Sequence, residues 1–186
     1  MDVRTEAGTL VARLRTLFTW RDDGADIAAW WAHADVLSGL GAALAHLHAH
    51  TRPSVVIAPE ASGFIIGPLV ALEANAGFVE MRKGRADGDF GDRILVQDRV
   101  LTRSTPPDFA NRTLDWVVQR RVLRPGHRVL FVDDWVETAA TAQTARRIVE
   151  DSGATWIGAA VIVDATSGQA HPDLRLRALL RRRELS

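Results

Sequence analysis

The chain has 186 residues, of which 47% are hydrophobic and 25% charged, as expected for an ordinary globular domain with a core of its own. This composition excludes a disordered chain, and the absence of cysteine excludes disulfides and thiolate zinc sites. Because 23 basic and 23 acidic side chains give a formal net charge of zero, a dedicated nucleic-acid binder is not expected. No apolar run approaches the roughly 18 residues of a membrane span, and the charged N-terminus does not resemble a signal peptide. The expected location is therefore the cytoplasm.

The first third of the chain is predicted to be helical. Apolar residues at helical spacing indicate an amphipathic helix over residues 2–18, and residues 20–25 indicate a turn. An alanine-rich helical pattern then runs over residues 26–50, with an expected break near Ser38 and Gly39. Pro53 ends this helical region.

A strand–helix–strand unit follows. Residues 54–59 form a short apolar run with β-branched residues, which is typical of a buried strand. A helix is expected to begin at Ser62 and Gly63 and to run to about Asn75, and residues 77–81 indicate the next strand. This order is typical of a parallel sheet.

Residues 84–112 are rich in glycine, proline and charge, and indicate a long exposed loop with a hairpin. Strands are then expected over residues 128–132 and 155–163, with a helix over residues 141–152 between them. The last segment, residues 173–185, is predicted to be a terminal helix whose arginines form a solvated face. The fold class predicted is α/β, with a central, mostly parallel sheet flanked by helices in one domain.

The strongest functional signal lies where the strand over residues 128–132 ends. Two adjacent acids, Asp133 and Asp134, come directly after it, and a short polar loop then leads into a helix. Ligands bind at the carboxyl ends of parallel strands, and the free N–H groups of a helix N-terminus suit a phosphate. With the hydroxyls of Thr138 and Thr141 nearby, these groups favour a phosphorylated sugar. Simple strand capping by the two acids is the alternative.

Residues 129–141, an apolar strand followed by two acids and a Thr-containing loop, resemble the phosphoribosyl diphosphate (PRPP) motif of the type I phosphoribosyltransferases. Residues 59–84 independently resemble the adenine phosphoribosyltransferase pattern, and the Leu-x-Pro-Gly turn at residues 123–126 fits the spacing. The resemblance covers about residues 52–165. It implies the fold of that family, with a variable hood built from the N-terminal and C-terminal segments and with residues 84–112 as the loop that closes over the reaction centre.

The resemblance also implies roles for individual residues. Asp133 and Asp134 would bind the ribose hydroxyls and belong, with Glu137, to the catalytic group, while Trp135 lies beside the sugar. The 5′-phosphate would be bound by Glu137, Thr138, Ala139, Ala140 and Thr141. The diphosphate would be bound by a loop that often contains a cis peptide bond and by two basic residues, namely Glu60, Ala61, Ser62, Gly63, Arg82 and Lys83.

The implied ligands are PRPP, a nucleobase that is a purine by the nearest pattern, and Mg²⁺ bound through PRPP. No nucleic acid or membrane partner is implied, and members of the family are often dimers, which implies a homodimer.

The sequence departs from the family pattern at several positions. Ala139 and Ala140 stand where the loop usually has two glycines, and Ser62 stands in place of an arginine. The Glu-Tyr pair of the flexible loop would fall near Ala110 and Asn111, and the chain has no tyrosine.

Glu137 and the tryptophans each allow two interpretations. Glu137 is either a general base toward the purine or a carboxylate that caps the following helix. Trp135, like the tryptophans of residues 20–31, either stacks on the base or packs in the core.

Three functions remain open on the sequence. The first is transfer of phosphoribose from PRPP to a nucleobase with release of diphosphate. The second is a non-catalytic module that binds PRPP or a nucleotide, which the altered loops favour. The third is a hydrolase that uses water as the acceptor.

Overall fold

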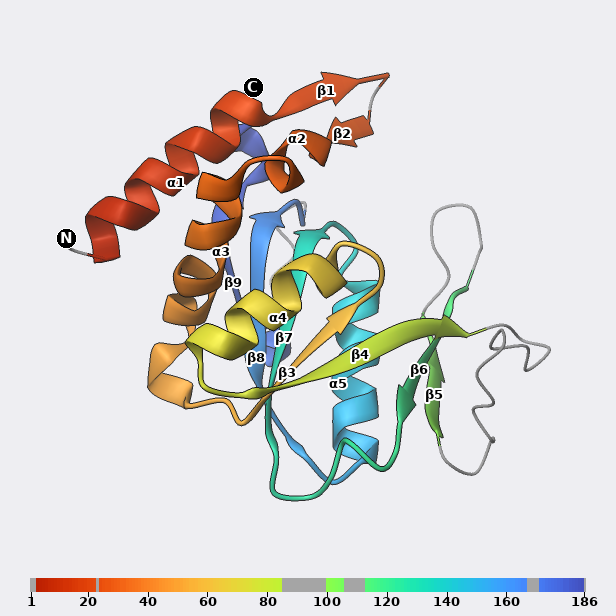
Figure 1. Cartoon of the computed structure of the whole chain (residues 1–186). Coiled ribbons are helices and arrows are strands. Elements are labelled where there is room, and N and C mark those ends of the chain that lie inside the picture. The colour runs from red at the N-terminus through yellow and green to blue at the C-terminus, as the bar shows by residue number, and fades with distance from the viewer. Residues whose placement is uncertain (1–2, 23, 85–99, 106–112, 167–170, 186) are drawn as a thin grey trace.

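The computed structural model of the protein describes residues 3–22, 24–84, 100–105, 113–166 and 171–185. Its main feature is a seven-stranded sheet in the order β5-β6-β4-β3-β7-β8-β9 (Figure 1). The strands of this sheet are β3 (Val55–Pro59), β4 (Gly77–Gly84), β5 (Val100–Ser104), β6 (Asp115–Gln119), β7 (Arg128–Val136), β8 (Thr155–Asp164) and β9 (Leu176–Arg181). Strands β4, β3, β7, β8 and β9 are parallel to their neighbours, while β6 runs antiparallel to both β4 and β5. The predicted mostly parallel α/β sheet is confirmed.

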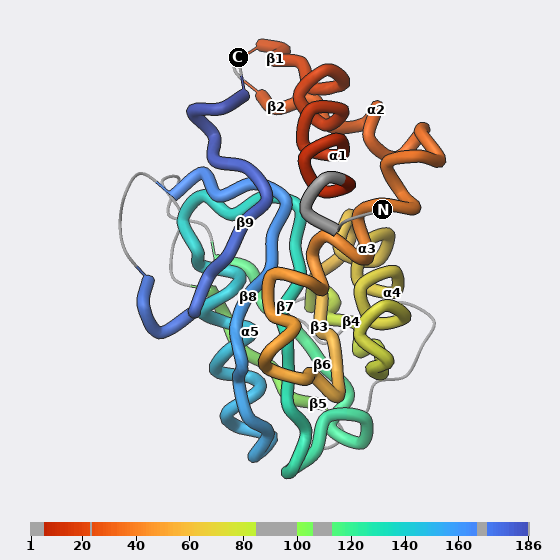
Figure 2. The backbone as a smooth tube through the Cα atoms, turned by 90° about the vertical axis from the view of Figure 1, so that its left-hand side faces the viewer, coloured from red at the N-terminus to blue at the C-terminus, as the bar shows by residue number. Residues whose placement is uncertain are grey.

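Helices cover both faces of the sheet. Figure 2 shows α1, α3 and α4 on one side of the sheet and α5 on the other. The helices are α1 (Val3–Leu17), α2 (Ala28–Trp31), α3 (Ala34–Leu47), α4 (Gly63–Glu73) and α5 (Ala140–Asp151), with short 3-10 turns η1 (Ala49–Thr51), η3 (Pro172–Leu174) and η4 (Arg182–Glu184). No helix among the described residues combines the length and the apolar character that a membrane crossing requires.

The central strand β7 contributes to the core on both faces. Leu130 and Val132 pack in the cluster under α1, α3 and α4, whereas Val129 and Phe131 pack in the cluster under α5. A strand buried on both faces needs a continuous apolar run, which is why the sequence signal for this strand was clear.

The N-terminal end differs from the expectations in two places. The break in the pattern over residues 26–50 falls between α2 and α3, at Ala32 and His33, and not at Ser38 and Gly39. Gly39 lies inside α3, where it faces Leu10 of α1. The turn expected over residues 20–25 is a hairpin of two short strands, β1 (Thr19–Arg21) and β2 (Gly24–Asp26).

The expected terminal helix is wrong. Residues 176–181 form strand β9, which pairs in parallel with β8 from Ala159↔Leu176 to Asp164↔Arg181. The local sequence favours a helix, but pairing with the exposed edge of β8 satisfies the backbone and buries Leu180. Tertiary pairing has therefore overridden local propensity.

The loop expected over residues 84–112 is described only in part. Residues 100–104 form β5, which pairs as an antiparallel ladder with β6, a strand beyond the expected loop that the sequence did not predict. Residues 85–99 and 106–112, including the positions Ala110 and Asn111, lie outside the described residues.

A bulge in β8 packs against His48, the residue that follows α3. The register between β7 and β8 shifts after Val129↔Trp156, so that Leu130 pairs with Gly158 and Ile157 is the extra residue. Gly158 has a φ of +150° and lies against the buried ring of His48. The His48 Nε2 lies 3.1 Å from the carbonyl oxygen of Ala159, and burial lowers the pKa of the ring. His48 is therefore the neutral tautomer that donates from Nε2 to Ala159.

We predict that Gly158→Ala lowers the free energy of unfolding by about 2–3 kcal/mol, because the new Cβ would lie 2.3 Å from Cε1 of His48 and would strain the backbone. Urea denaturation measures this difference. Gly77→Ala in β4 is the matched control, since its Cβ would meet only the Ser54 carbonyl oxygen at 3.8 Å. Equal losses in both variants would show that the His48 contact does not matter.

Candidate active site

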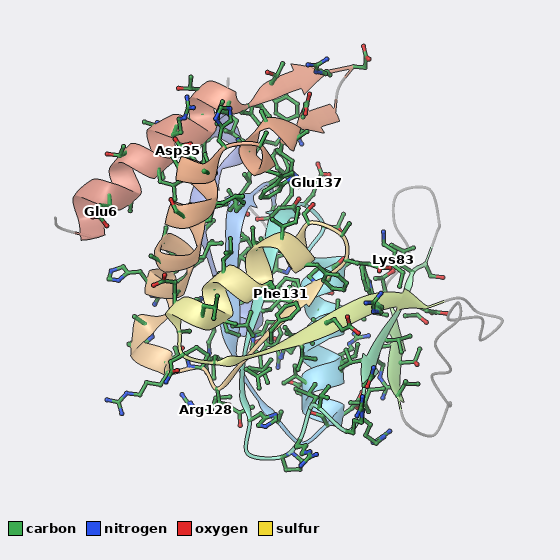
Figure 3. All side chains as sticks on the ribbon, in the orientation of Figure 1. Glu6, Asp35, Lys83, Arg128, Phe131 and Glu137 are labelled. Atoms are coloured by element: carbon green, nitrogen blue, oxygen red, sulfur yellow. The ribbon has the colours of Figure 1, made fainter. Side chains whose placement is uncertain are left out.

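Two loops meet at the carboxyl edge of the sheet because β3 and β7 are parallel neighbours. Strand β3 leads through residues 60–62 into α4, and β7 leads through residues 137–139 into α5. Figure 3 shows Arg128 at the start of β7 and Glu137 beyond its other end, with Lys83 near the end of β4. This is the edge at which open parallel sheets bind ligands.

The β7 loop surrounds a hollow of about 220 Å³. Its lining residues are Asp133, Trp135, Val136, Glu137, Thr138, Ala139, Ala140, Thr141 and Ala142. The structure thus brings together every residue that the sequence placed around the sugar 5′-phosphate, together with one of the two acids. Asp134 is not among the lining residues.

Asp133 is a buried carboxyl beside a second acid. Burial raises its pKa well above the usual range, and the neighbouring Asp134 charge adds to this effect. The Asp134 backbone N–H donates to Asp133 Oδ1 over 2.9 Å, which fixes the carboxyl in place. A carboxyl with a raised pKa can donate or accept a hydrogen bond, which suits a ligand with hydroxyl groups.

The loop ends at a left-handed residue, Ala139, with a φ of +59°. Its methyl group is buried in the cluster under α5. The N-cap residue, Ala139, makes no side-chain cap, and the Ala140 N–H donates to Thr138 Oγ1 over 3.4 Å, which leaves the next N–H groups of the first turn without a side-chain partner. The first turn of α5 therefore presents backbone N–H groups to the hollow, which is the arrangement that binds an anion.

Glu137 pairs with a residue from the opposite end of the chain. Its Oε1 accepts a hydrogen bond from Nη1 of Arg182 over 2.8 Å. Among the described contacts Glu137 makes no hydrogen bond to the first turn of α5, so the structure does not show it as a side-chain cap. The sequence reasoning missed Arg182, and no local signal could have found it, since the tail was expected to be a solvated helix.

The β3 loop is held against β4. The Glu60–Ala61 peptide bond is cis, as the resemblance implied. Glu60 N–H donates to the Met81 carbonyl oxygen over 3.0 Å, and Glu60 Oε1 accepts from the Lys83 N–H over 2.9 Å. Ser62 and Gly63 then begin α4, with Ser62 at the N-cap.

Arg82 and Lys83 are adjacent on β4 and point to opposite faces of the sheet. Arg82 bonds to Glu80 over 2.7 Å and lies 5.3 Å from the centroid of the Phe64 ring. The Lys83 ammonium lies 5.9 Å from the centroid of Trp116, on the other face. The expectation that both face one diphosphate stays a prediction, and in the structure the two side chains lie on opposite faces of β4.

Trp135 packs against the N-terminal hairpin. Its ring stacks on Phe18 at a centroid distance of 6.2 Å and meets the edge of Trp20 at 6.1 Å. Trp30 is fully buried and donates to the Leu14 carbonyl oxygen. The core-packing interpretation thus describes Trp30 and much of Trp135, although Trp135 also lines the hollow.

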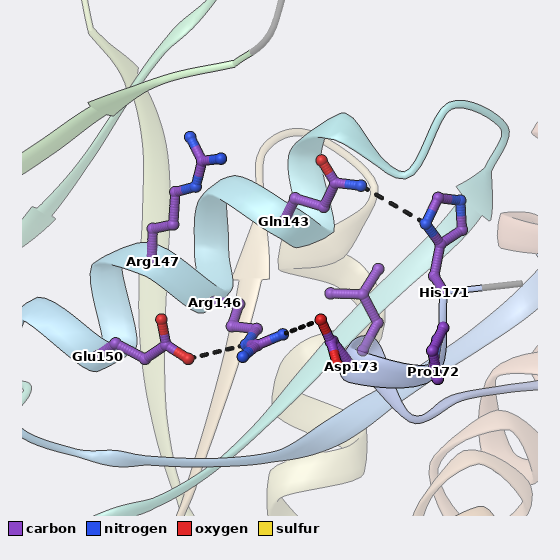
Figure 4. A pocket seen from close by; sticks show the side chains of 8 residues that line it. Gln143, Arg146, Arg147, Glu150, His171, Pro172 and Asp173 are labelled. Atoms are coloured by element: carbon purple, nitrogen blue, oxygen red, sulfur yellow. Dashed lines mark hydrogen bonds and ion pairs between the residues drawn. The ribbon is translucent and has the colours of Figure 1, made fainter.

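A larger hollow of about 380 Å³ lies along the outer side of α5 (Figure 4). Arg146 stands in it between Glu150 and Asp173, at 2.8 Å and 3.3 Å, and His171 lies 3.5 Å from Gln143. Both acids of this hollow are bonded to Arg146, and Arg147 and His171 also line it, so it offers no free carboxyl for sugar hydroxyls. The smaller hollow at β7 has such a carboxyl in Asp133.

Comparison with known proteins identifies the family to which the chain belongs. The family model described as "Phosphoribosyl transferase domain" matches residues 32–178. An adenine phosphoribosyltransferase of Cupriavidus pinatubonensis is 30% identical over 166 residues, which cover 88% of this chain and 82% of that protein. One from Dinoroseobacter shibae is 35% identical over 121 residues, covering 65% of this chain and 58% of that protein.

Solved structures share the fold. The adenine phosphoribosyltransferase of Rhodothermus marinus has a TM-score of 0.78 at 23% identity, with 94% of this chain and 99% of that chain covered. That of Trypanosoma brucei, in complex with AMP, pyrophosphate and ribose-5-phosphate, has a TM-score of 0.75 at 19% identity, with 95% and 81% covered. The chain belongs to the phosphoribosyltransferase family, and the resemblance seen in its sequence is confirmed.

We predict that Asp133→Asn raises the free energy of unfolding at neutral pH by about 1 kcal/mol, or roughly 2–4 °C in melting temperature. The raised pKa means that the folded state binds a proton more tightly than the unfolded state. Stability from this carboxyl is therefore present at low pH and is lost as the pH rises through its folded pKa. The advantage of the variant should disappear below about pH 4, where the carboxyl of the unfolded chain is also protonated. Thermal melts at several pH values measure this, and a constant difference between the two proteins would contradict the assignment.

Proposed function

We propose that the protein transfers the phosphoribosyl group of PRPP to a purine base and releases diphosphate. The observation that carries the proposal is the hollow at the end of β7, where a buried acid and an uncapped helix N-terminus face the same space. A phosphorylated sugar needs both kinds of group, one for hydroxyls and one for a phosphate. Adenine is the first acceptor to test, because the relatives named above are adenine phosphoribosyltransferases.

The loop after β7 would bind the 5′-phosphate. Thr138 and Thr141 supply hydroxyl donors, and the N–H groups at the start of α5 supply backbone donors. Asp133 and Asp134 would hold the two ribose hydroxyls and orient C1 of the sugar toward the acceptor base. Figure 3 shows how Glu137 marks the position of this loop at the end of β7.

The loop after β3 would bind the diphosphate. Its bonds to Met81 and to the Lys83 N–H fix residues 60–63 beside β4, from which Lys83 and Arg82 can approach on two sides. During transfer the bond from C1 to the diphosphate oxygen breaks with its electron pair, and a bond from a ring nitrogen of the base forms. The proton of that nitrogen leaves to a base or to solvent.

Magnesium would come with PRPP as part of the substrate. Among the described residues, no group of three or more His, Cys, Asp or Glu side chains is placed to hold a metal ion. A cation that offsets the charge of the leaving diphosphate fits such a site better than one bound by the protein alone.

The N-terminal and C-terminal segments would form the hood of a single domain around the core of residues 52–165. In the described residues, Trp20 donates from Nε1 to the Leu185 carbonyl oxygen over 3.2 Å, so the two ends of the chain meet. Exclusion of water at this place matters because water would otherwise capture an oxocarbenium-like sugar.

A second candidate is binding of PRPP or a nucleotide without turnover. Ala139 supports it, because a left-handed alanine places a methyl group where the family pattern has glycine. Incubation with PRPP and Mg²⁺ against a panel of purines and pyrimidines separates the candidates. Release of diphosphate with a purine supports transfer. Binding by calorimetry without release supports the second candidate, and loss of PRPP without any base would show hydrolysis.

We predict that Asp134→Asn weakens the binding of Mg²⁺·PRPP by about three- to tenfold, because the amide loses a charged acceptor for a ribose hydroxyl. Isothermal titration calorimetry measures the dissociation constant. Asp173→Asn, in the hollow along α5, is the matched control and should leave the affinity unchanged. An unchanged affinity for Asp134→Asn would show that the acids have been misinterpreted.

We predict that Ala139→Gly strengthens the binding of ribose 5-phosphate about two- to fivefold, because glycine adopts the left-handed conformation without strain and lets the loop backbone adjust to the phosphate. Its stability should change by less than ~1 kcal/mol, since relief of the left-handed alanine offsets the lost methyl burial. Ala140→Gly is the control: it should lose about 0.5–1 kcal/mol of stability without gaining affinity, because Ala140 is already helical. A gain in affinity from both variants would point to general loosening of the loop.

A further inference from the structure

The end of the chain is attached to the mouth of the β7 loop by several independent contacts. Arg182 bonds to Glu137, and its guanidinium carbon lies 5.1 Å from the centroid of the Trp20 ring. The turn that carries Arg182 is held by Glu184, whose Oε2 accepts from the Arg181 N–H over 2.8 Å and whose Oε1 pairs with Arg15 over 2.5 Å. Both views of the backbone place the C-terminus beside β1 (Figures 1 and 2).

The strand that precedes this turn is attached as well. Arg181, the last residue of β9, lies 3.3 Å from Asp164 at the end of β8, and Leu185 is buried in the cluster under α1 and α3. The position of Arg182 is therefore set by β9, by Trp20 and by the turn, independently of its bond to Glu137.

Glu137 creates an electrostatic problem for the proposed function. It lines the same hollow as the helix N-terminus that would bind the 5′-phosphate. A bare carboxylate at that place would repel a dianionic phosphate, and the repulsion would be strongest at low salt. Arg182 supplies the one positive side chain that the described structure shows bonded to this carboxylate.

We propose that Arg182 is a positioning residue for the phosphate loop. It neutralises Glu137 and holds that side chain to one side, so that the first turn of α5 is open to the sugar phosphate. The inference rests on the proposed function, because it concerns the same loop. The C-terminal turn is then part of the substrate-binding site, and the role of Glu137 is to shape the phosphate loop.

Arg182→Met tests the proposal, since methionine keeps an apolar stem over Trp20 and removes the charge. The expected result is an affinity for Mg²⁺·PRPP about fivefold lower by calorimetry at low salt, with the loss shrinking as salt rises. In the Glu137→Gln background the same change should alter the affinity less than twofold, because no carboxylate is left to neutralise. Arg182→Lys should retain most of the affinity.

Arg183→Met is the matched control, because Arg183 is the exposed neighbour in the same turn and should leave the affinity within twofold of the wild type. Equal losses from Arg182→Met with and without Glu137 would give Arg182 a merely structural role and would overturn the proposal. An unchanged affinity in Arg182→Met would overturn it too. If the wild type does not bind Mg²⁺·PRPP, both the proposed function and this inference fail. If the wild type binds Mg²⁺·PRPP and Arg182→Met binds it equally well, only this inference fails.

Discussion

Parallel pairing of β3 with β7 is the constraint on which the rest of the site depends. Because both strands end at the same edge, the loop that begins at Glu60 and the loop that begins at Glu137 are neighbours, although 77 residues of sequence separate their first residues. Each loop leads directly into a helix, and the first turn of α5 brings backbone N–H groups without a helical partner to that edge. A substrate with an anionic group at each end can span two such loops, and the acids after Val132 lie where its neutral middle would be.

The sequence predicted the centre of the molecule well for a physical reason. Strands such as β3, β7 and β8 are buried on both faces, so their apolar runs are continuous and easy to recognise. Asp133 interrupts such a run at a buried position, and a charge in the core has to be explained by function or by a partner. The family motif is built from these same features, so the fold and the phosphate loop were predicted together.

The sequence failed where distant parts of the chain decide the outcome. Residues 176–181 have the composition of a helix and form a strand, because the edge of β8 offers hydrogen bonds that no local pattern records. The error hid Arg182, whose contact with Glu137 follows from β9 and not from spacing. Arg82 and Lys83 are adjacent in the sequence, which suggests that they act together. The alternation of side chains on β4 instead places them on opposite faces of the sheet. Ala139 could be recognised as an unusual residue, but its left-handed conformation could not be derived from its identity.

The contact between His48 and Gly158 ties the end of α3 to the bulge of β8, far from both loops. The His48 ring occupies the space that a side chain at position 158 would need, so the residues at these two positions constrain each other. A relative that carries any side chain at the position of Gly158 has to carry a smaller residue at the position of His48, or else to build the strand without its extra residue. We therefore expect the residues at positions 48 and 158 to change together among relatives, and the histidine to indicate the bulge when only the sequence of a relative is known.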